Sequence, residues 1–252
     1  SWAEKTSYEA AAAIIAVSDG MRADVLAAYP DVDPKKVVTI RNGVDTSKFA
    51  PNNNPAVLEE FGITGRYAMF VGRITRQKGL AHLLRAWKSV PVEYGLVLAA
   101  GSPDEETVGN EVAALIAELQ ATRSNVWWIK EMLPHDKLTA ALTQADLFLC
   151  PSIYEPLGIV NLEAMGCETA VLASRVGGIP EVVSHQETGI LVDYTPDHSR
   201  FETELSAAIS ELMADPARLE KYGKAGRVRA ETHFGWDAVA EQTISLYRSV
   251  IS

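Results

Sequence analysis

An apolar strand, a polar turn and a helix follow one another between residues 147 and 166, and they constrain the fold more than any other stretch. Leu147–Cys150 is a continuous apolar run, as expected of a strand buried in a parallel sheet. Pro151 ends it, and from Leu157 apolar side chains recur at helical spacing up to Gly166. In an open α/β sheet, ligands bind where a strand ends and a helix begins. The free N–H groups of residues 157–159 are expected to favour an anion there, such as a phosphate.

Two carboxylates lie on either side of the predicted helix start, Glu155 before it and Glu163 near its second turn. Glycosidases place two catalytic carboxyl groups roughly 5–9.5 Å apart, so such a pair is one interpretation. However, five or six helical residues, at about 1.5 Å each, carry Glu163 roughly 8–9 Å further along the axis. We therefore expect the two side chains to face different parts of one ligand. A pair of ordinary solvated glutamates is the alternative.

Three cations, Arg73, Arg76 and Lys78, crowd the loop between a predicted strand at Tyr67–Val71 and the helix after it. A helix N-terminus is already positive and disfavours each nearby cation by about 0.3–1 kcal/mol. Nothing nearby in the sequence neutralises these three, so a bound polyanion such as a diphosphate would explain their position. Solvated surface charges are the alternative.

The rest of the chain alternates short apolar runs with helical patterns. Further strands are predicted at 14–17, 37–40, 96–101, 126–129, 169–173 and 188–192. Residues 46–65 are rich in Asn, Pro and Gly and are expected to be irregular, whereas the chain from Arg200 onward has a helical pattern. This order predicts an α/β fold in which all strands join one doubly wound, mostly parallel sheet with helices on both faces.

Charge and composition exclude several classes of protein. The formal net charge of −10 argues against a broad nucleic-acid surface and against binding to an anionic membrane. No apolar run approaches the length of about 18 residues that a membrane span needs, and no signal peptide is visible. Cys150 and Cys167 have apolar neighbours and are expected to be reduced thiols of a cytoplasmic protein. The histidines lack metal-ligand spacing, and Asp31 and Asp33 lie in a proline-flanked turn, so no metal is expected.

The stretch around Glu155 resembles a known signature. Glu155-Pro-Leu-Gly158, followed by Glu163, is similar to the E-P-x-G-x-x-x-x-E motif of retaining GT-B glycosyltransferases of the glycogen synthase and sucrose synthase type. The resemblance continues, in the expected order, at Arg41–Asp45, Val71–Arg73, Lys78-Gly79 and Gly177–Glu181. The amino-acid sequence near residues 132–134, 152–154 and 161–165 most resembles that of actinobacterial glycogen synthase-like enzymes, which use ADP-glucose.

The resemblance implies a Rossmann-like domain that is the C-terminal, donor-binding half of a GT-B enzyme. Residues 18–235 would form this nucleotide-sugar-binding domain. Residues 1–17 would link it to an N-terminal acceptor domain that precedes Ser1, and residues 236–252 would form a helix that crosses back to that domain. The acceptor domain would supply a histidine to the catalytic cleft.

Individual residues receive roles from the same resemblance. The catalytic set would be Glu155, Arg73 and Lys78: Glu155 would contact the donor sugar, while Arg73 and Lys78 would bind the diphosphate. Glu163 would hold the ribose of the nucleotide.

Backbone and apolar groups would complete the donor site. Leu157 and Gly158 would present helix N–H groups to the diphosphate, which becomes the leaving group. Met132 and Leu133 lie in the loop that would receive the nucleotide base, although simple apolar packing of that loop is the alternative.

The implied reaction is the transfer of glucose, with retention of configuration, from a nucleotide-glucose to a glucan or to a sugar-phosphate acceptor that yields maltose 1-phosphate. ADP-glucose would be a co-substrate, and no cofactor is implied. The main alternative is a module for a UDP- or GDP-sugar that is inactive in isolation. A nicotinamide dehydrogenase would need Gly-x-Gly-x-x-Gly after its first strand, where this chain has Ser18-Asp-Gly20. A pyridoxal-dependent phosphorylase would need a lysine presented for a Schiff base, and Lys78 is already assigned.

Overall fold

Two parallel sheets form the β structure of the computed structural model, which describes residues 2–251. Six strands form the larger sheet, in the order β5-β4-β3-β6-β7-β8, and β1 and β2 form the smaller one. The strands are β1 (Ile14–Ala16), β2 (Val37–Thr39), β3 (Tyr67–Ile74), β4 (Gly95–Pro103), β5 (Val126–Ile129), β6 (Leu147–Cys150), β7 (Ala170–Ser174) and β8 (Gly189–Val192).

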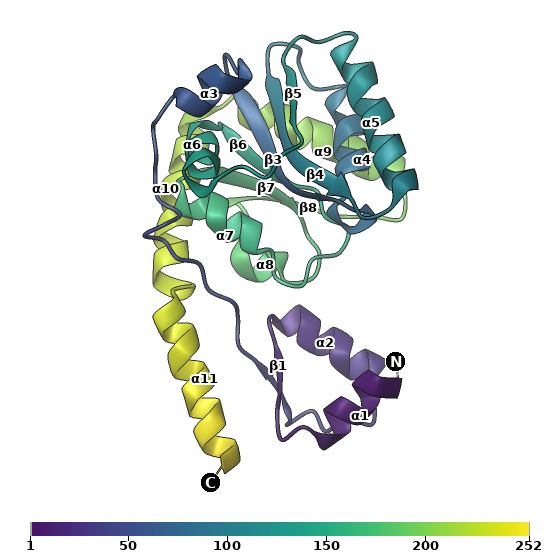
Figure 1. Ribbon diagram of the computed structural model, residues 1–252, viewed down its shortest axis with the longest axis vertical. Helices are drawn as coiled ribbons and strands as arrows, with labels where there is room; N and C mark the ends of the chain where they lie inside the picture. Colours follow the sequence, from purple (N-terminus) through teal and green to yellow (C-terminus); the bar gives the residue numbers. More distant parts are fainter. Residues whose placement is uncertain (1, 252) are drawn as a thin grey trace.

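Helices cover both faces of the larger sheet (Figure 1). One core lies under α4, α5 and α9, and the other lies mainly under α3, α6, α7 and α8. The helices are α1 (Trp2–Ala10), α2 (Asp19–Ala28), α3 (Ala56–Phe61), α4 (Leu80–Trp87), α5 (Glu106–Gln120), α6 (His135–Gln144), α7 (Ile159–Gly166), α8 (Ile179–Val182), α9 (His198–Met213), α10 (Pro216–His233) and α11 (Trp236–Ile251).

The two cores explain why the central strands are apolar throughout. In β3, Phe70 belongs to the core under α4, whereas Met69, its neighbour in the chain, belongs to the core on the opposite face. Successive side chains of a strand point to opposite faces, so a strand covered on both sides cannot alternate between polar and apolar residues. The doubly wound, parallel α/β fold predicted from the sequence is confirmed.

The strand order brings two loops together. Counted along the chain, the six strands lie in the order 3-2-1-4-5-6, in which the winding reverses between the first and the fourth, β3 and β6. These strands are neighbours, with Ala68 opposite Leu147 and Met69 opposite Phe148. The loops that leave their carboxyl ends therefore begin side by side, at the point where doubly wound sheets bind ligands.

The first two strands do not join the larger sheet, so the expectation of a single sheet is wrong. β1 and β2 pair only with each other and share a small core of their own, which includes Ile14, Val25 and Val37. With α1 and α2 they form a separate small lobe, drawn in purple in Figure 1. The proposed domain boundaries stay a prediction, and their outer ends, residues 1 and 252, lie outside the described residues.

The stretch 46–65, expected to be irregular, contains the short helix α3, so that expectation is wrong for residues 56–61.

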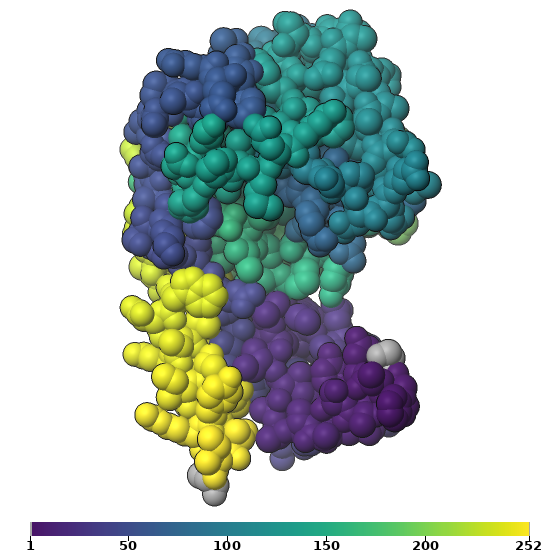
Figure 2. All heavy atoms as spheres, in the orientation of Figure 1, coloured from purple at the N-terminus to yellow at the C-terminus, as the bar shows by residue number. Residues whose placement is uncertain are grey.

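The last helix, α11, has no buried residue among those that the structure describes. Figure 2 shows α11 (yellow) and the small lobe (purple) extending from the same end of the α/β body.

Candidate functional site

Lys78 and Glu155 meet where the loops after β3 and β6 come together. Lys78 ends a short 3₁₀ turn (Arg76–Lys78) whose N-cap, Thr75, accepts a hydrogen bond from the Lys78 backbone N–H through its hydroxyl. The Lys78 Nζ donates to Glu155 Oε2 at 2.7 Å, and the Ser152 hydroxyl donates to the same oxygen at 3.3 Å. Glu155 is 8% exposed. Its second oxygen, Oε1, has no hydrogen-bond partner in the described part of the chain, so it is available to a ligand.

The helix after Glu155 begins at Ile159, two residues later than the sequence predicts. Gly158 is its N-cap, with a φ of +94° that only glycine adopts readily, and it offers no side chain to the first N–H groups of α7. Leu157 is buried in the core. A pocket of about 330 Å³, lined by Lys78, Glu155 and Gly158 among others, opens beside this helix start. The pocket therefore contains two of the predicted catalytic side chains and an uncapped helix N-terminus.

A larger pocket, of about 590 Å³, lies at the carboxyl ends of β3, β4 and β5. It contains three of the predicted residues. Arg73 lies at its edge, with a side chain that is 70% exposed and pairs with Asp104 at 2.8 Å. Leu133 is buried, whereas Met132 is 95% exposed. An exposed methionine beside a pocket leaves apolar surface in water, and a ligand that covered this side chain would bury that surface.

The two pockets adjoin at Gly72 and Lys78. Gly72 lines the larger pocket and Lys78 lines the smaller one. A Cβ atom placed on Gly72 would lie 3.9 Å from Cδ of Lys78, so the lysine stem passes directly over this glycine. The two pockets have no lining residue in common but approach each other at Lys78, and we refer to the pair as the cleft.

The three cations of the β3 loop each have an acidic partner that lies far away in the sequence. Arg73 pairs with Asp104, Lys78 with Glu155, and Arg76 approaches Glu105 at 3.6 Å. No neutralising group lies nearby in the sequence, as expected, but the fold brings one to each cation, so unmatched charge does not by itself require a bound polyanion. These pairs join residues from different loops, and sequence distance alone does not indicate them.

Glu163 lies outside the lining of both pockets, on the first two turns of α7. Burial raises the pKa of its carboxyl group from 4.5 to about 7, while the charges of His135 and Lys78 act in the opposite direction. Among the described residues, the Glu163 carboxyl group has no hydrogen-bond or ion-pair partner, whereas its backbone carbonyl accepts from the Cys167 N–H. Glu163 is thus a partly buried carboxyl group close to Lys78 and without a fixed partner.

Asn161 was not identified from the sequence. It lies in the first turn of α7, is completely buried, and neither polar atom of its side chain has a hydrogen-bond partner in the described structure. A Cβ atom on Gly158 would approach Asn161 Nδ2 to 2.6 Å, so the amide lies directly behind the helix start. Unsatisfied buried amides are rare and costly. An asparagine within an apolar helical pattern was the signal that could have revealed it.

The small lobe holds the Glu155 loop from the other side. The Ser18 hydroxyl donates to the Pro156 carbonyl at 2.5 Å. Glu181, at the start of α8, accepts from the Gly20 N–H at 3.1 Å and from Arg41 Nε at 2.7 Å. These contacts join three loops, so a shift of the small lobe would displace the backbone next to Glu155.

The remaining sequence expectations concern cysteines, metals and membranes. Cys150 and Cys167 are both free and buried, and burial raises the pKa of the Cys167 thiol to about 12. Within residues 2–251, no group of His, Cys, Asp and Glu side chains is placed to hold a metal ion. Over the same residues, no helix combines the length and apolar character of a membrane span.

Comparisons with known proteins find glycosyltransferase families over most of the chain. Residues 59–229 match the family model described as glycosyl transferases group 1, and residues 1–48 match the model of glycosyltransferase family 4. An alpha-maltose-1-phosphate synthase of Mycolicibacterium smegmatis is 49% identical over 99% of this chain and 66% of its own length. A D-inositol 3-phosphate glycosyltransferase of Segniliparus rotundus is 33% identical, over 94% of this chain and 54% of its own.

A solved structure shows the same architecture. The sucrose-phosphate synthase of Thermosynechococcus elongatus superposes with a TM-score of 0.83 at 31% identity, covering 99% of this chain and 61% of that one. The chain therefore spans at most 66% of the length of these relatives. On the family match and the shared fold, the chain belongs to the group 1 glycosyltransferases of the GT-B type.

Proposed function

We propose that this chain is the donor half of a retaining glucosyltransferase that uses ADP-glucose. The observation that carries the proposal is the Lys78–Glu155 ion pair, which lies between a large pocket with an exposed methionine and an uncapped helix N-terminus. A nucleoside diphosphate sugar has a matching order of parts: an aromatic base with its ribose, a dianionic diphosphate and a hydroxylated sugar.

Each part of the donor has a chemical counterpart along the cleft. The base would enter the 590 Å³ pocket and cover Met132 and Leu133. The diphosphate would lie against Arg73 and Lys78, with the first N–H groups of α7 in reach. The sugar would lie in the 330 Å³ pocket, where Glu155 Oε1 accepts a hydroxyl group. Glu163, close to Lys78, would take the ribose hydroxyls.

The chemistry follows from the leaving group. Breaking the bond between the sugar and the diphosphate develops negative charge on the phosphate oxygens, and preorganised cations and helix N–H groups stabilise that charge. Arg73 would exchange its exposed ion pair with Asp104 for the phosphate, at little cost. Glu155 would orient the sugar and not attack it, in accordance with same-face displacement and retention. Neither a metal nor a cofactor is required by this scheme.

The names of the relatives favour one of the two acceptor classes. Alpha-maltose-1-phosphate synthase, sucrose-phosphate synthase and D-inositol 3-phosphate glycosyltransferase are all named for a phosphorylated sugar or polyol. We therefore favour a sugar-phosphate acceptor, with maltose 1-phosphate as the product, over a glucan. That acceptor would be bound by the part of the protein that this chain does not contain.

A calorimetric titration with ADP-, UDP- and GDP-glucose tests the donor assignment. ADP-glucose should bind at least tenfold more tightly than the other two, a difference of about 1.4 kcal/mol. Tighter binding of UDP- or GDP-glucose would support the alternative of a module for a different donor. Failure of all three to bind would contradict the proposal.

A further inference from the structure

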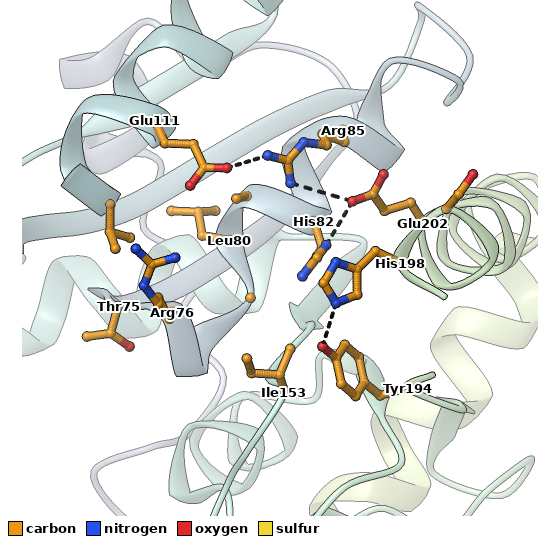
Figure 3. Close-up of a pocket in the computed structure, with 14 residues that line it drawn as sticks. Thr75, Arg76, Leu80, His82, Arg85, Glu111, Ile153, Tyr194, His198 and Glu202 are labelled. Atoms are coloured by element: carbon orange, nitrogen blue, oxygen red, sulfur yellow. Dashed lines mark hydrogen bonds and ion pairs between the residues drawn. The ribbon is translucent and has the colours of Figure 1, made fainter. Parts of the chain in front are cut away.

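A third pocket, separate from the two pockets of the donor cleft, opens between α4, α5 and α9 (Figure 3). It encloses about 470 Å³, within the usual range for small-molecule sites. We call it the α4–α9 pocket and define it by Arg76, His82, Arg85, Glu111, His198 and Glu202. None of the residues that line it also lines either pocket of the donor cleft.

The two carboxylates of this pocket, Glu111 and Glu202, both contact basic side chains. Arg85 pairs with Glu111 and lies 3.6 Å from Glu202, and Glu202 also contacts His82 Nδ1 at 2.8 Å. The three contacts form a connected wall along one side of the pocket (Figure 3). His198 extends this wall, with its ring centroid 4.7 Å from that of His82.

One cation remains poorly matched. Arg76 lines the pocket, and its only ion-pair partner among residues 2–251 is Glu105, at 3.6 Å. Charge-assisted hydrogen bonds are usually about 2.7–2.9 Å long, and this pair is 62% and 59% exposed, so little free energy holds it together. An anion in the pocket could therefore take Arg76 from Glu105 at small cost.

The wall of the pocket suits hydroxyl groups. His82 Nδ1 is hydrogen-bonded to the Glu202 carboxylate, which leaves Nε2 as the ring nitrogen open to a ligand. No residue described in the structure occupies Nε2. Tyr194 adds a hydroxyl group, held at 3.2 Å from His198 Nε2. Polar side chains thus outnumber apolar ones, such as Leu80 and Ile153, although apolar atoms supply much of the exposed lining.

We propose that the α4–α9 pocket binds a small hydroxylated phosphate of the sugar-monophosphate class. The phosphate pairs with Arg76, and the hydroxyl groups bind His82, Tyr194 and the carboxylates of the wall. This site is additional to the proposed donor cleft and does not depend on the identity of the donor.

The pocket shares its loops with the donor cleft, so we expect binding at the two sites to be energetically coupled. Arg76 lies two residues before Lys78 in the same 3₁₀ turn. The Ile153 N–H donates to the Gln77 carbonyl at 2.8 Å, which ties that turn to the loop of Glu155. A Cβ atom on Gly79 would lie 2.0 Å from the Pro151 carbonyl oxygen, so the loops cannot move independently. A ligand that binds Arg76 is therefore expected to change the position of Lys78.

Isothermal titration of the 252-residue chain tests the site. The probes are glucose 1-phosphate, glycerol 3-phosphate and inorganic phosphate, with glucose as the uncharged control. Glucose 1-phosphate should bind at least tenfold more tightly than inorganic phosphate and than glucose. Arg76→Ala should weaken its binding at least tenfold. Arg200→Ala is the matched control, because Arg200 is 66% exposed, is ion-paired on α9 and lines none of the three pockets.

The same titration at increasing ADP concentrations locates the probe. Linkage between two sites shifts the affinity for glucose 1-phosphate to a plateau, and the affinity for ADP shifts by the same factor. An apparent affinity that keeps falling in proportion to ADP would mean that the probe occupies the donor cleft, and this would overturn the proposal. Normal binding by Arg76→Ala, or no binding of any phosphate, would overturn it as well. If ADP itself does not bind, the donor assignment fails. The comparison of Arg76→Ala with the unaltered chain still tests the α4–α9 pocket in that case.

Discussion

At the scale of single residues, Glu163 is a carboxyl group that the fold keeps partly away from water. Its folded pKa of about 7 lies above the value of about 4.3 for an unfolded glutamate. As the pH rises between these values, the unfolded chain releases this proton before the folded one does. Stability therefore falls over that interval and changes no further above it.

Replacing this carboxyl group should change how stability depends on pH. Glu163→Gln should raise the unfolding midpoint relative to the unaltered chain at pH 8, where the folded carboxyl group is ionised. At pH 4, where it is protonated, the two midpoints should agree. Thermal unfolding followed by circular dichroism measures both. An equal gain at the two pH values would show that burial of charge is not the cause.

The two glutamates should respond differently to the donor. Glu163→Gln should weaken ADP and ADP-glucose alike, because the ribose is common to both. Glu155→Gln should leave ADP affinity nearly intact and weaken only ADP-glucose, because Glu155 lines the pocket proposed for the sugar. Titration of both variants with both ligands gives the comparison. Loss of ADP binding in Glu155→Gln would refute the sugar-side placement of Glu155.

At the scale of elements, the loop before α8 clamps the loop that carries Glu155. Gly177 has a φ of +52°, and a Cβ atom there would lie 2.0 Å from the Glu155 carbonyl oxygen. The adjacent Gly178 N–H donates to the same oxygen at 3.0 Å. The position of Glu155 thus depends on a close approach of two backbones.

Adding one methyl group should separate strain from collision. Gly177→Ala should destabilise the chain through backbone strain and through collision with the Glu155 carbonyl oxygen. The loss should exceed the roughly 1–3 kcal/mol that backbone strain alone costs. Gly62→Ala is the matched control, since Gly62 has a φ of +63° but no atom within 4 Å of the added Cβ. Urea unfolding of the two variants yields the difference. Equal losses would mean that the clamp contributes nothing.

Local sequence patterns predicted the helices and strands better than they predicted which residues and strands pair with each other. The apolar run of β6, the proline after it and the apolar spacing from Leu157 indicated a strand, a loop and a helix without tertiary information. By contrast, Arg73 pairs across 31 residues and Lys78 across 77, and no local pattern encodes such contacts. The separate sheet of β1 and β2 was missed for the same reason, because strand pairing is not local. The helix start at Ile159 depends on the positive φ of Gly158, which the spacing of apolar residues does not report.

At the scale of the whole molecule, we propose that the chain supplies one side of an interdomain cleft. It covers 66% of the length of its maltose-1-phosphate synthase relative, and α11 has no buried residue within the described structure. In a two-domain enzyme, closure excludes water and orients the reacting groups, and orientation can supply about 7–11 kcal/mol.

The chain alone should therefore bind the donor but hardly transfer glucose. Turnover with a sugar-phosphate acceptor should rise by several orders of magnitude once the preceding domain is restored. A product assay on the chain and on the longer protein measures this difference. Rapid transfer by the 252-residue chain, or no gain in the longer protein, would be incompatible with the division of labour proposed here.

The central claim, that Arg73 and Lys78 hold a nucleoside diphosphate, is tested most directly by calorimetric titration with ADP and with adenosine. Charged hydrogen bonds contribute about 1.5–3 kcal/mol each, so Arg73→Ala and Lys78→Ala should each weaken ADP binding at least tenfold and leave adenosine unaffected. Arg200→Ala should bind both as the unaltered chain does. Because Lys78→Ala leaves Glu155 unpaired, its folding is verified by thermal unfolding first. Equal losses for ADP and adenosine would contradict the claim, since they would show that the two cations support the fold and not the phosphates.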